Sequence, residues 1–395
     1  MIKLIKSTFY KEQDTKVQLT KFISSAKQLS FGSECEKFEK NFAKYQGRKY
    51  CVFLNSGSSA NLALTQSLLN LGLLQKNDLV GFSALTWATN VMPLIQLGLK
   101  PIPIDIELGT LNVSSQKLLK IVEKYSLKAL LITNLLGFCD DLEKIKRICA
   151  LKKIILLEDN CEALGTIYKG IKLGNFGLAS TFSFFVGHHM STIEGGAICT
   201  DDRELAKMLK MVRAHGWDRH LELSDRKTLK DKHGIKDFHA NYTFYDLAYN
   251  LRPTEVNGFL GNSQLKHMDE VIKNRQSNFT ELANVIYNDK HFIPIKYNHI
   301  DLVSNFAFPV VCQSKDTYNK LIRKCRNKLE IRPIVGGNML LQPFFKKYLL
   351  YYLGLERLFD CPNAELAHRQ GFYFGNNPEL TNKEIKDIKS IFSNL

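Results

Sequence analysis

Seven short apolar runs recur between residues 50 and 200, and amphipathic stretches separate most of them. Residues 116–125 and 141–151 are two of these stretches, and their apolar positions repeat with helical spacing. Strand–helix alternation over this length predicts a mainly parallel sheet with helices on both faces. The predicted strands are residues 50–54, 79–82, 101–106, 129–134, 154–159, 180–184 and 197–200.

The chain changes character on either side of this alternation. Before it, residues 14–45 predict two helices with a break near Gly32. Beyond about residue 265 the pattern becomes that of a smaller α+β unit, so we expect a large α/β domain over residues 1–264 and a small domain over residues 265–395. The small domain should contain strands near residues 303–312, a helix at 315–327 and a capped final helix from Thr381.

The net charge of +15 comes from basic residues that are scattered along the chain. The densest run, from Arg219 to Lys236, mixes both signs of charge, which predicts a solvated loop rather than a nucleic-acid-binding arm. A basic surface would attract an anionic substrate such as a sugar nucleotide, but lysine enrichment from genome composition explains the charge equally well. We therefore expect no nucleic-acid partner.

We expect neither membrane insertion nor secretion. No apolar run approaches the roughly 18 residues that span a bilayer. The N-terminus becomes charged too early for a signal peptide. The nine cysteines contain no C-x-x-C pair and no spacing of a disulfide framework, which favours reduced thiols in the cytoplasm.

The segment from Leu54 to Leu62 is a candidate phosphate site. It follows a predicted strand and opens a helix, and its small residues, including Gly57 and Ser58, let backbone amides approach an anion. Turns rich in glycine and serine also precede many helices that bind nothing. A purely structural turn is therefore the alternative.

Two further patterns carry ionisable groups. Glu158 and Asp159 end a predicted strand, where open α/β sheets bind ligands, although a helix cap or a salt bridge would place carboxylates there too. His188 and His189 are adjacent, whereas paired metal ligands prefer other spacings, and no third ligand lies at a suitable distance along the chain. We therefore expect no metal site at the histidines.

Taken in order, these segments and several others resemble the nucleotide-sugar aminotransferase family of the DegT/StrS type. The resemblance runs from about residue 30 to the C-terminus. It implies a fold-type-I pyridoxal-phosphate (PLP) architecture with a seven-stranded, mainly parallel sheet, and a homodimer with shared active sites. The matching segments are NSGSSANL (55–62), ALTWATN (84–90), EDNCEALG (158–165), residues 168–177, FSFFVGHH (182–189), EGG (194–196) and YNLRPTE (249–255).

The resemblance also implies roles for individual residues. Those that would contact the cofactor are Gly57, Ser58 and Ser183 at its phosphate, Trp87 stacked on its ring, Asp159 at the ring nitrogen, Glu162 near the ring, and Asn250 at the phosphate of the neighbouring subunit. Arg252 and Arg332 are candidates for binding the donor carboxylates or the substrate diphosphate, with salt bridges as the alternative. His215 would lie near the substrate, and a structural histidine is equally compatible with its position.

One position departs from the aminotransferase pattern. His188 stands where the family has the lysine that binds the cofactor covalently, and no lysine occurs between Lys172 and Lys207. A site without that amine should hold pyridoxamine phosphate (PMP) non-covalently, with imidazole as its general base. The histidine doublet and residues 332–338 resemble a 3-dehydratase branch of the family.

This branch implies an activity and its partners. The enzyme would remove the C3 hydroxyl of a nucleotide-linked 4-keto-6-deoxy sugar, a GDP-linked hexose or heptose, and give a 3-deoxy-4-keto sugar. Glutamate would restore PMP, and ammonia would be released. A sugar aminotransferase and an inert regulatory homologue are the alternatives; the retained Trp87, Asp159 and Ser183 argue against the latter.

A CDP-sugar relative in the same branch carries a [2Fe–2S] cluster on four cysteines. Cys161 matches one of the four ligand positions. The others would include a C-x-C pair after the histidine, but residues 217–238 contain no cysteine. We therefore expect no iron–sulfur cluster and a redox-neutral reaction.

Overall fold

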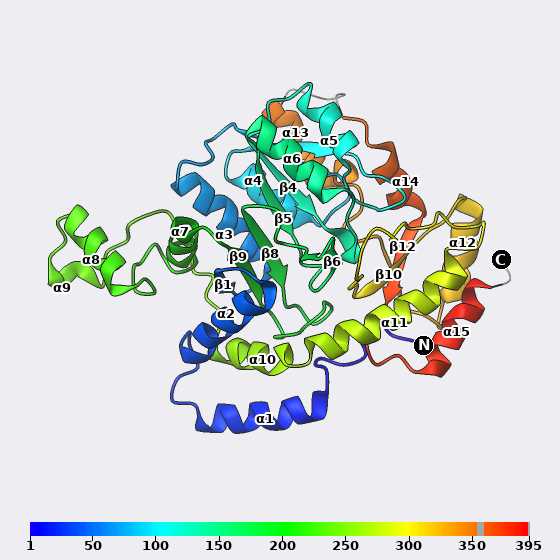
Figure 1. The fold of residues 1–395 in the computed structure, drawn as a ribbon, viewed down its shortest axis with the longest axis horizontal. Coiled ribbons are helices and arrows are strands. Elements are labelled where there is room, and N and C mark those ends of the chain that lie inside the picture. Colours follow the sequence, from blue (N-terminus) through cyan, green and yellow to red (C-terminus); the bar gives the residue numbers. More distant parts are fainter. Residues whose placement is uncertain (354–358, 394–395) are drawn as a thin grey trace.

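A seven-stranded sheet forms the centre of the molecule (Figure 1). The structure is a computed structural model that describes residues 1–353 and 359–393. The strand order is β1-β9-β8-β5-β4-β2-β3, and only the pairs that involve β9 are antiparallel. All seven predicted strands are confirmed to within two residues: β1 (Tyr50–Leu54), β2 (Leu79–Ser83), β3 (Lys100–Ile104), β4 (Ala129–Thr133), β5 (Ile155–Asp159), β8 (Ala179–Ser183) and β9 (Gly196–Thr200).

Helices cover both faces of this sheet because successive residues of a strand point to opposite sides. In β1, Val52 and Leu54 pack with the core beneath α3 (Gly57–Asn70) and α7 (Arg203–Arg213). Phe53 instead packs on α2 (Ser33–Gln46). Further helices are α4 (Met92–Gln96) on the α3 side, and α5 (Ser115–Val122) and α6 (Leu142–Lys152) on the α2 side.

A smaller antiparallel sheet lies beside the large one and follows the long helix α11 (Met268–Ile286). Its strand order is β10-β12-β11. The N-terminus returns to this region, since Ile2 bridges Leu329. The boundary at residue 264 stays a prediction. The elements are β10 (Ala307–Val311), α12 (Lys315–Cys325), β11 (Ile331–Pro333), α13 (Pro343–Leu353), α14 (Pro362–Gln370), β12 (Gly371–Gly375) and α15 (Asn382–Phe392), whose predicted cap at Thr381 is confirmed.

The charged run at 219–236 was predicted as a loop, and this prediction is wrong. It contains α8 (Leu223–Lys232), followed by α9 (Asp237–Ala240), and together they project from the body of the molecule (Figure 1). The residues of α8 are mostly charged and form no apolar face, so the sequence has no hydrophobic periodicity that would predict a helix. Lys and Arg are nevertheless good helix formers, and Asp225 anchors the helix by pairing with Arg203 at 2.9 Å.

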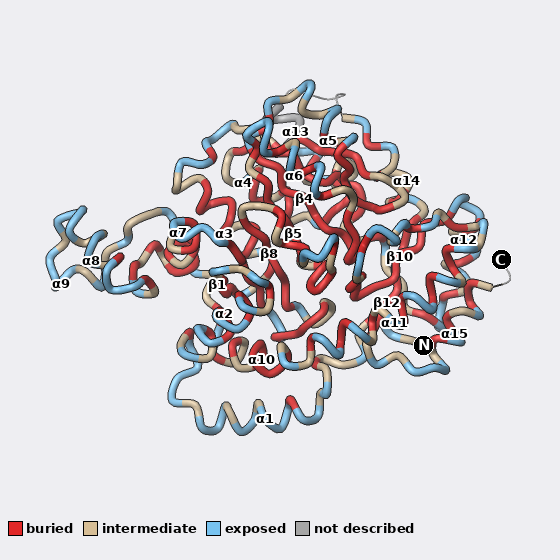
Figure 2. Tube along the Cα trace, in the orientation of Figure 1, coloured by how far each residue is buried: buried red, intermediate tan, exposed pale blue. Residues whose placement is uncertain are grey.

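The predicted helices at 14–45 are confirmed as α1 (Glu12–Ser25) and α2. Helix α1 lies along α10 (Glu255–Leu265), and Phe22 stacks on Phe259 with ring centroids 4.5 Å apart. Both α1 and the α8–α9 projection are largely exposed (Figure 2). No helix within residues 1–353 and 359–393 is long and apolar enough to span a bilayer.

Candidate active site

A cavity of about 290 Å³ opens at the carboxyl ends of the central strands. Open α/β sheets bind their ligands at this edge. The cavity also receives side chains from the small sheet, so both sheets contribute to its wall. Eight residues predicted from the sequence lie together around it: Gly57, Ser58, Trp87, Asp159, Glu162, Ser183, His188 and Arg332.

The N-terminus of α3 forms one end of the cavity. Ser56 caps the helix by accepting a hydrogen bond from the Ser59 amide at 3.0 Å. A Cβ at Gly57 would lie 2.6 Å from the Cβ of Ser183, so only glycine permits this close approach. The exposed amides and the helix dipole make this end suitable for an anion.

Asp159 is buried at the end of β5, and three donors fix its carboxylate. Its Oδ2 accepts hydrogen bonds from Nδ2 of Asn61 at 2.9 Å and from Nδ2 of Asn90 at 2.7 Å. Its Oδ1 accepts one from the Cys161 amide at 2.9 Å. A carboxylate held in this way can pair with a protonated ring nitrogen without reorganising.

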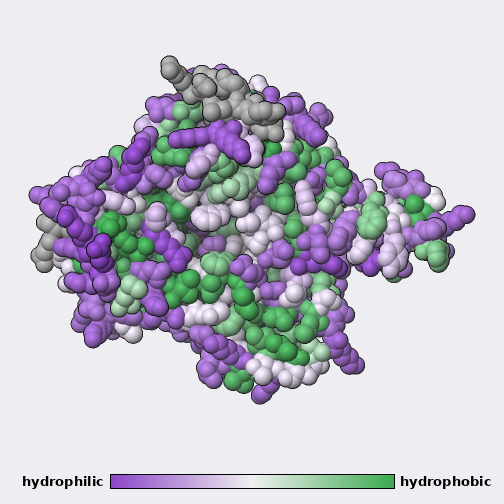
Figure 3. Space-filling model, turned by 180° about the vertical axis from the view of Figure 1, so that it is seen from behind, coloured by the Kyte–Doolittle hydropathy of each residue, from purple (hydrophilic) through white to green (hydrophobic). Residues whose placement is uncertain are grey.

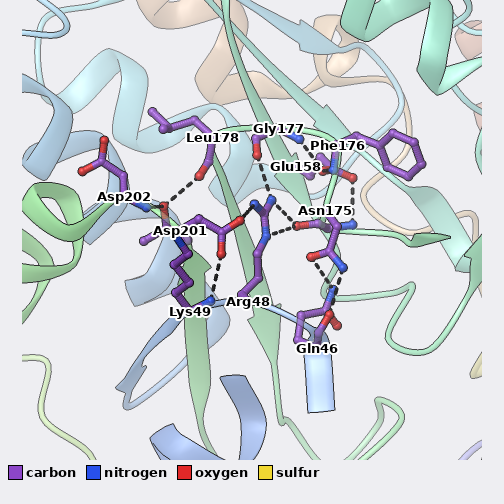
Figure 4. A network of polar contacts seen from close by, with 12 residues as sticks. Gln46, Arg48, Lys49, Glu158, Asn175, Phe176, Gly177, Leu178, Asp201 and Asp202 are labelled. Carbon is purple, nitrogen blue, oxygen red and sulfur yellow. Dashed lines mark hydrogen bonds and ion pairs between the residues drawn. The ribbon is translucent and has the colours of Figure 1, made fainter. Parts of the chain in front are cut away.

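Glu158 precedes Asp159 but points to the opposite face of the sheet, where it is structural. It is fully buried and accepts hydrogen bonds from the amides of Phe176 and Gly177 at 2.7 and 2.8 Å. Arg48 donates hydrogen bonds to carbonyl oxygens of the same loop, among them that of Gly177 at 2.7 Å. It also pairs with Asp201 at 2.8 Å (Figure 4). This network fixes the start of β8, the strand that ends at Ser183.

Glu162 is buried in the cavity wall and is a carboxylic acid at neutral pH. Burial raises its pKa to about 8, and the charge of Asp159 adds to the shift. Its Oε2 accepts a hydrogen bond from the Leu136 amide at 2.9 Å, which opposes the shift only in part. The protonated group can donate a hydrogen bond to a ligand oxygen.

His188 lies on the loop after β8, where its amide donates to the Phe185 carbonyl at 2.9 Å. Burial lowers the pKa of the imidazole to about 4, although the Asp159 carboxylate acts in the opposite direction. The ring is therefore neutral at physiological pH and can accept a proton. No lysine is present among the described residues that line the cavity.

The wall of the cavity also contains Arg332 and residues that sequence reasoning missed. Arg332 pairs with Glu330 at 3.1 Å and lies beside Tyr373, whose pKa burial raises to about 12. The sequence carried no local signal for Tyr373, because it reaches the cavity from a distant strand. The other missed lining residues include Thr89, Asn90, Thr133, Phe185, Glu194 and Phe306.

Three predicted residues lie together but outside this cavity. His215 packs against Trp217 with ring centroids 4.6 Å apart. Arg252 donates from Nε to Oδ1 of Asn250 at 3.0 Å, and its guanidinium lies 5.9 Å from the Trp217 ring. The single chain does not bring these residues to Asp159 or His188, and their roles stay predictions.

Comparison with known proteins places the chain among sugar-modifying enzymes. The sequence model of the DegT/DnrJ/EryC1/StrS aminotransferase family matches residues 10–393. The chain is 34% identical to the GDP-4-keto-6-deoxy-D-mannose 3-dehydratase of Yersinia pseudotuberculosis, with 93% of each protein covered. It is 33% identical to the enzyme of that name from Escherichia coli O55:H7, with 96% of each covered.

Solved structures of such dehydratases have the same fold. The E. coli enzyme with bound hydrated PLP superposes with a TM-score of 0.89 at 31% identity, covering 100% of this chain and 99% of that one. A GDP-4-keto-6-deoxymannose-3-dehydratase with a trapped PLP-glutamate geminal diamine gives a TM-score of 0.88 at 30% identity, with both chains fully covered.

Proposed function

We propose, from the premise that the chain belongs to the DegT/DnrJ/EryC1/StrS aminotransferase family, that it is a PLP/PMP-dependent sugar-nucleotide 3-dehydratase. It removes the C3 hydroxyl of a nucleotide-linked 4-keto-6-deoxy sugar and yields the 3-deoxy-4-keto sugar. One observation carries the proposal. The described residues that line the cavity supply the contacts of a PLP site but include no lysine. At the position where the family has its lysine, the candidate base is His188. This histidine distinguishes a dehydratase from an aminotransferase.

The residues present fit the cofactor. The amides at Gly57 and Ser58 and the hydroxyl of Ser183 would hold the phosphate at the N-terminus of α3. Trp87 borders the cavity with an exposed ring that can stack on the pyridine, and Asp159 would pair with the ring nitrogen. When bound, the cofactor supplies an amine for the C4 ketone and a ring that accepts electrons.

His188 performs the proton transfers at this site. Because its imidazole is neutral and lies half-buried at the cavity, it can take a proton from the cofactor's C4′ carbon and return it to the departing C3 hydroxyl. Glu162, protonated at neutral pH, donates a hydrogen bond to an oxygen near the ring. Asp159 keeps the ring nitrogen protonated through its charge.

The substrate is a GDP-linked 4-keto-6-deoxy hexose or heptose, and glutamate is the amino donor. The relatives named for GDP-sugar chemistry support the nucleotide, and the solved structure of such a dehydratase with a PLP-glutamate geminal diamine supports the donor. Arg332, in the cavity wall, would bind a substrate diphosphate or a donor carboxylate. The net charge of +15 would assist the approach of either anion.

The proposal also includes the assembly: the protein would be a cytoplasmic homodimer in which the two chains share their active sites. The projection around α8 and α9 exposes large apolar side chains, among them Phe238 at 87% and Leu247 at 72%. Apolar side chains also gather on the rear surface of the molecule (Figure 3). Surfaces of this kind mark protein interfaces. A second copy would cover the projection and bring Asn250, with Arg252 and His215, to its neighbour's cavity.

The test is to incubate the protein, PLP and glutamate with a panel of 4-keto-6-deoxy sugar nucleotides and to weigh the products. A dehydratase yields a sugar lighter by one oxygen atom, together with ammonia. A product that keeps nitrogen on the sugar would show an aminotransferase. An unchanged panel, with no spectral response of bound PLP to glutamate, would show an inert homologue.

A further inference from the structure

The N-terminal segment, residues 2–7, lies against the edge of the small sheet and reaches the cofactor cavity. Ile2 pairs in parallel with Leu329, and its carbonyl accepts a hydrogen bond from the Glu330 amide at 2.9 Å. The segment thus extends the small sheet beside its edge strand β11. Leu4 follows, is buried, and lines the cofactor cavity. The segment therefore forms part of the cavity wall.

The segment is fixed on both sides of Leu4. Before it, Ile2 is held in the sheet. At Leu4 the backbone passes close to the end of β12, because a Cβ at Gly375 would lie 2.6 Å from the Leu4 carbonyl oxygen, an approach that glycine permits. After it, the hydroxyl of Ser7 donates a hydrogen bond to Oε2 of Glu379 at 3.0 Å. These contacts place the Leu4 amide where it can support the cavity.

Glu330 connects this amide to Arg332. Its Oε2 accepts a hydrogen bond from the Leu4 amide at 3.0 Å, and its Oε1 accepts one from Nη2 of Arg332 at 3.1 Å. Glu330 and Arg332 are two positions apart where the chain enters β11, so their side chains leave it on the same side. A carboxylate can serve both donors because it has two acceptor oxygens, whereas glutamine has one.

Arg332 is the member of this chain of contacts that can meet a ligand. It lines the cofactor cavity, and the bond to Glu330 uses one of the five N–H donors of a guanidinium. The pair is partly exposed, with 42% of the Arg332 and 29% of the Glu330 side chain accessible, so it contributes little to stability. A long side chain that is already held in place loses less freedom when it binds an anion. The consequence of the pair is therefore the placement of the guanidinium.

We propose that Glu330, held by the Leu4 amide, positions Arg332 to bind an anionic group of a substrate. The anion is a carboxylate of the amino donor or the diphosphate of the sugar nucleotide, so the inference rests on the proposed function for its ligands. Glu330 and the Leu4 amide act through Arg332 and are positioning groups. The N-terminal segment thereby belongs to the active site.

Equilibrium binding to the PLP-loaded protein tests this placement. Calorimetric titration with GDP probes the diphosphate, and titration with glutarate, a dicarboxylate without an amine, probes the donor. Arg332→Ala should raise the Kd of the probe that the guanidinium binds by about 10-fold or more. Glu330→Gln should raise the Kd of that same probe by about 3–10-fold, the effect of ordering one free side chain on binding.

A double-mutant cycle separates positioning from general damage. In the Arg332→Ala background, Glu330→Gln should have no further effect on Kd, because Glu330 acts through the guanidinium. Leu4→Pro removes the amide that holds Glu330 and should raise the Kd of the same probe to a similar extent. Ser7→Ala, which removes a hydrogen bond further along the segment, is the control and should leave the Kd unchanged. The PLP content of Glu330→Gln, measured by absorbance, should equal that of the wild type.

Several results would overturn the proposal. A Kd that falls in Glu330→Gln would show that the carboxylate competes with the ligand for Arg332, and an unchanged Kd would show that it does not act on binding. An equal effect of Glu330→Gln with and without Arg332 would assign it to general damage. Normal binding of both probes by Arg332→Ala would remove the guanidinium from the site, and normal binding by Leu4→Pro would remove the N-terminal segment.

The kinetic consequence is a change in KM without a change in kcat. Glu330→Gln should raise KM for the substrate whose probe it affects, by about the 3–10-fold expected for Kd, because the guanidinium contributes to binding rather than to proton transfer. The titrations involve no turnover, so they can contradict the positioning role while the protein still dehydrates its sugar. A wild type that binds the probe as expected but dehydrates no sugar would refute the proposed function alone.

Discussion

Asn90 donates a hydrogen bond from Nδ2 to Oδ2 of Asp159 at 2.7 Å and so joins the segment after Trp87 to the end of β5. Asn61 donates to the same oxygen from α3 at 2.9 Å. Three of the elements that border the cofactor cavity are thus connected at one carboxylate. The position of Asp159 depends on both amides.

Replacing Asn90 with alanine should weaken cofactor binding. Hydrogen bonds to charged groups contribute about 1.5–3 kcal/mol, and loss of one donor also frees Asp159 to shift away from the ring nitrogen. We expect the Kd for PLP, measured by titration of its absorbance, to rise about 10-fold or more. Asn70→Ala, at the C-terminal end of α3 and outside the cavity lining, is the control; an equal loss in both variants would contradict the argument.

Replacing Gly57 with alanine should damage the phosphate end of the cavity. The new Cβ would lie 2.6 Å from the Cβ of Ser183, so α3 and β8 would have to separate. We expect weaker PLP binding together with a thermal stability lowered by a few degrees, since overpacking costs about 1–3 kcal/mol. Adding Ser183→Gly should restore part of both; if it restores neither, the close contact is not the cause.

The sequence predicted most of the fold because the central strands are buried on both faces and read as continuous apolar runs. Where that signal fails, prediction fails too. α8 has no apolar face, so its sequence shows no helical periodicity, and the charged residues were predicted to form a loop. The opposite orientations of Glu158 and Asp159 could have been predicted, because strand side chains alternate.

The candidate site was predicted only where local motifs carry it. Gly57, Asp159 and His188 belong to recognisable segments, and the structure brings them to one cavity. Tyr373 carries no such signal, because it reaches the site from a distant strand. Asn250 and its neighbours do not line the cavity of their own chain, and we propose that they act at the cavity of a second subunit.

The pKa of Glu162 predicts how stability depends on pH. The carboxyl has a pKa of about 8 in the folded chain and an ordinary value of 4.5, so between these values the folded protein retains a proton that the unfolded chain loses. The contribution of this group to stability is complete below pH 4.5 and is lost as pH rises through 8, by about 1.4 kcal/mol per pH unit.

Urea unfolding of the apoprotein from pH 5 to 8 should therefore show Glu162→Gln gaining stability relative to the wild type as pH rises. His188 acts in the opposite sense, because its lowered pKa makes stability rise between about 4 and its ordinary 6.5. That contribution is common to both proteins and cancels in the difference. A difference that stays constant with pH would show that Glu162 is ionised in the folded state.

The chemistry at residue 188 predicts how the cofactor is held. Borohydride treatment of the loaded wild type should leave no pyridoxyl group on any lysine, because the described cavity wall contains none. His188→Lys should become covalently labelled at that position, as peptide mass mapping would show, and should lose dehydration. A labelled lysine in the wild type would refute the histidine site.

The same residue predicts a separation of binding from turnover. The phosphate end at Gly57, Ser58 and Ser183 is distinct from the base, so His188→Asn should retain PLP nearly as tightly as the wild type. Both the glutamate step and dehydration should be slowed by about 10⁴-fold or more, the upper end of what acid–base groups supply, because in the proposed mechanism one imidazole serves every proton transfer with no amine in reserve. Glutamate-dependent loss of PLP absorbance reports the first step, and mass spectrometry of the sugar reports the second.

His189→Asn, which retains His188, is the control and should slow both steps far less. Near-normal turnover of His188→Asn would assign the proton transfers to another group.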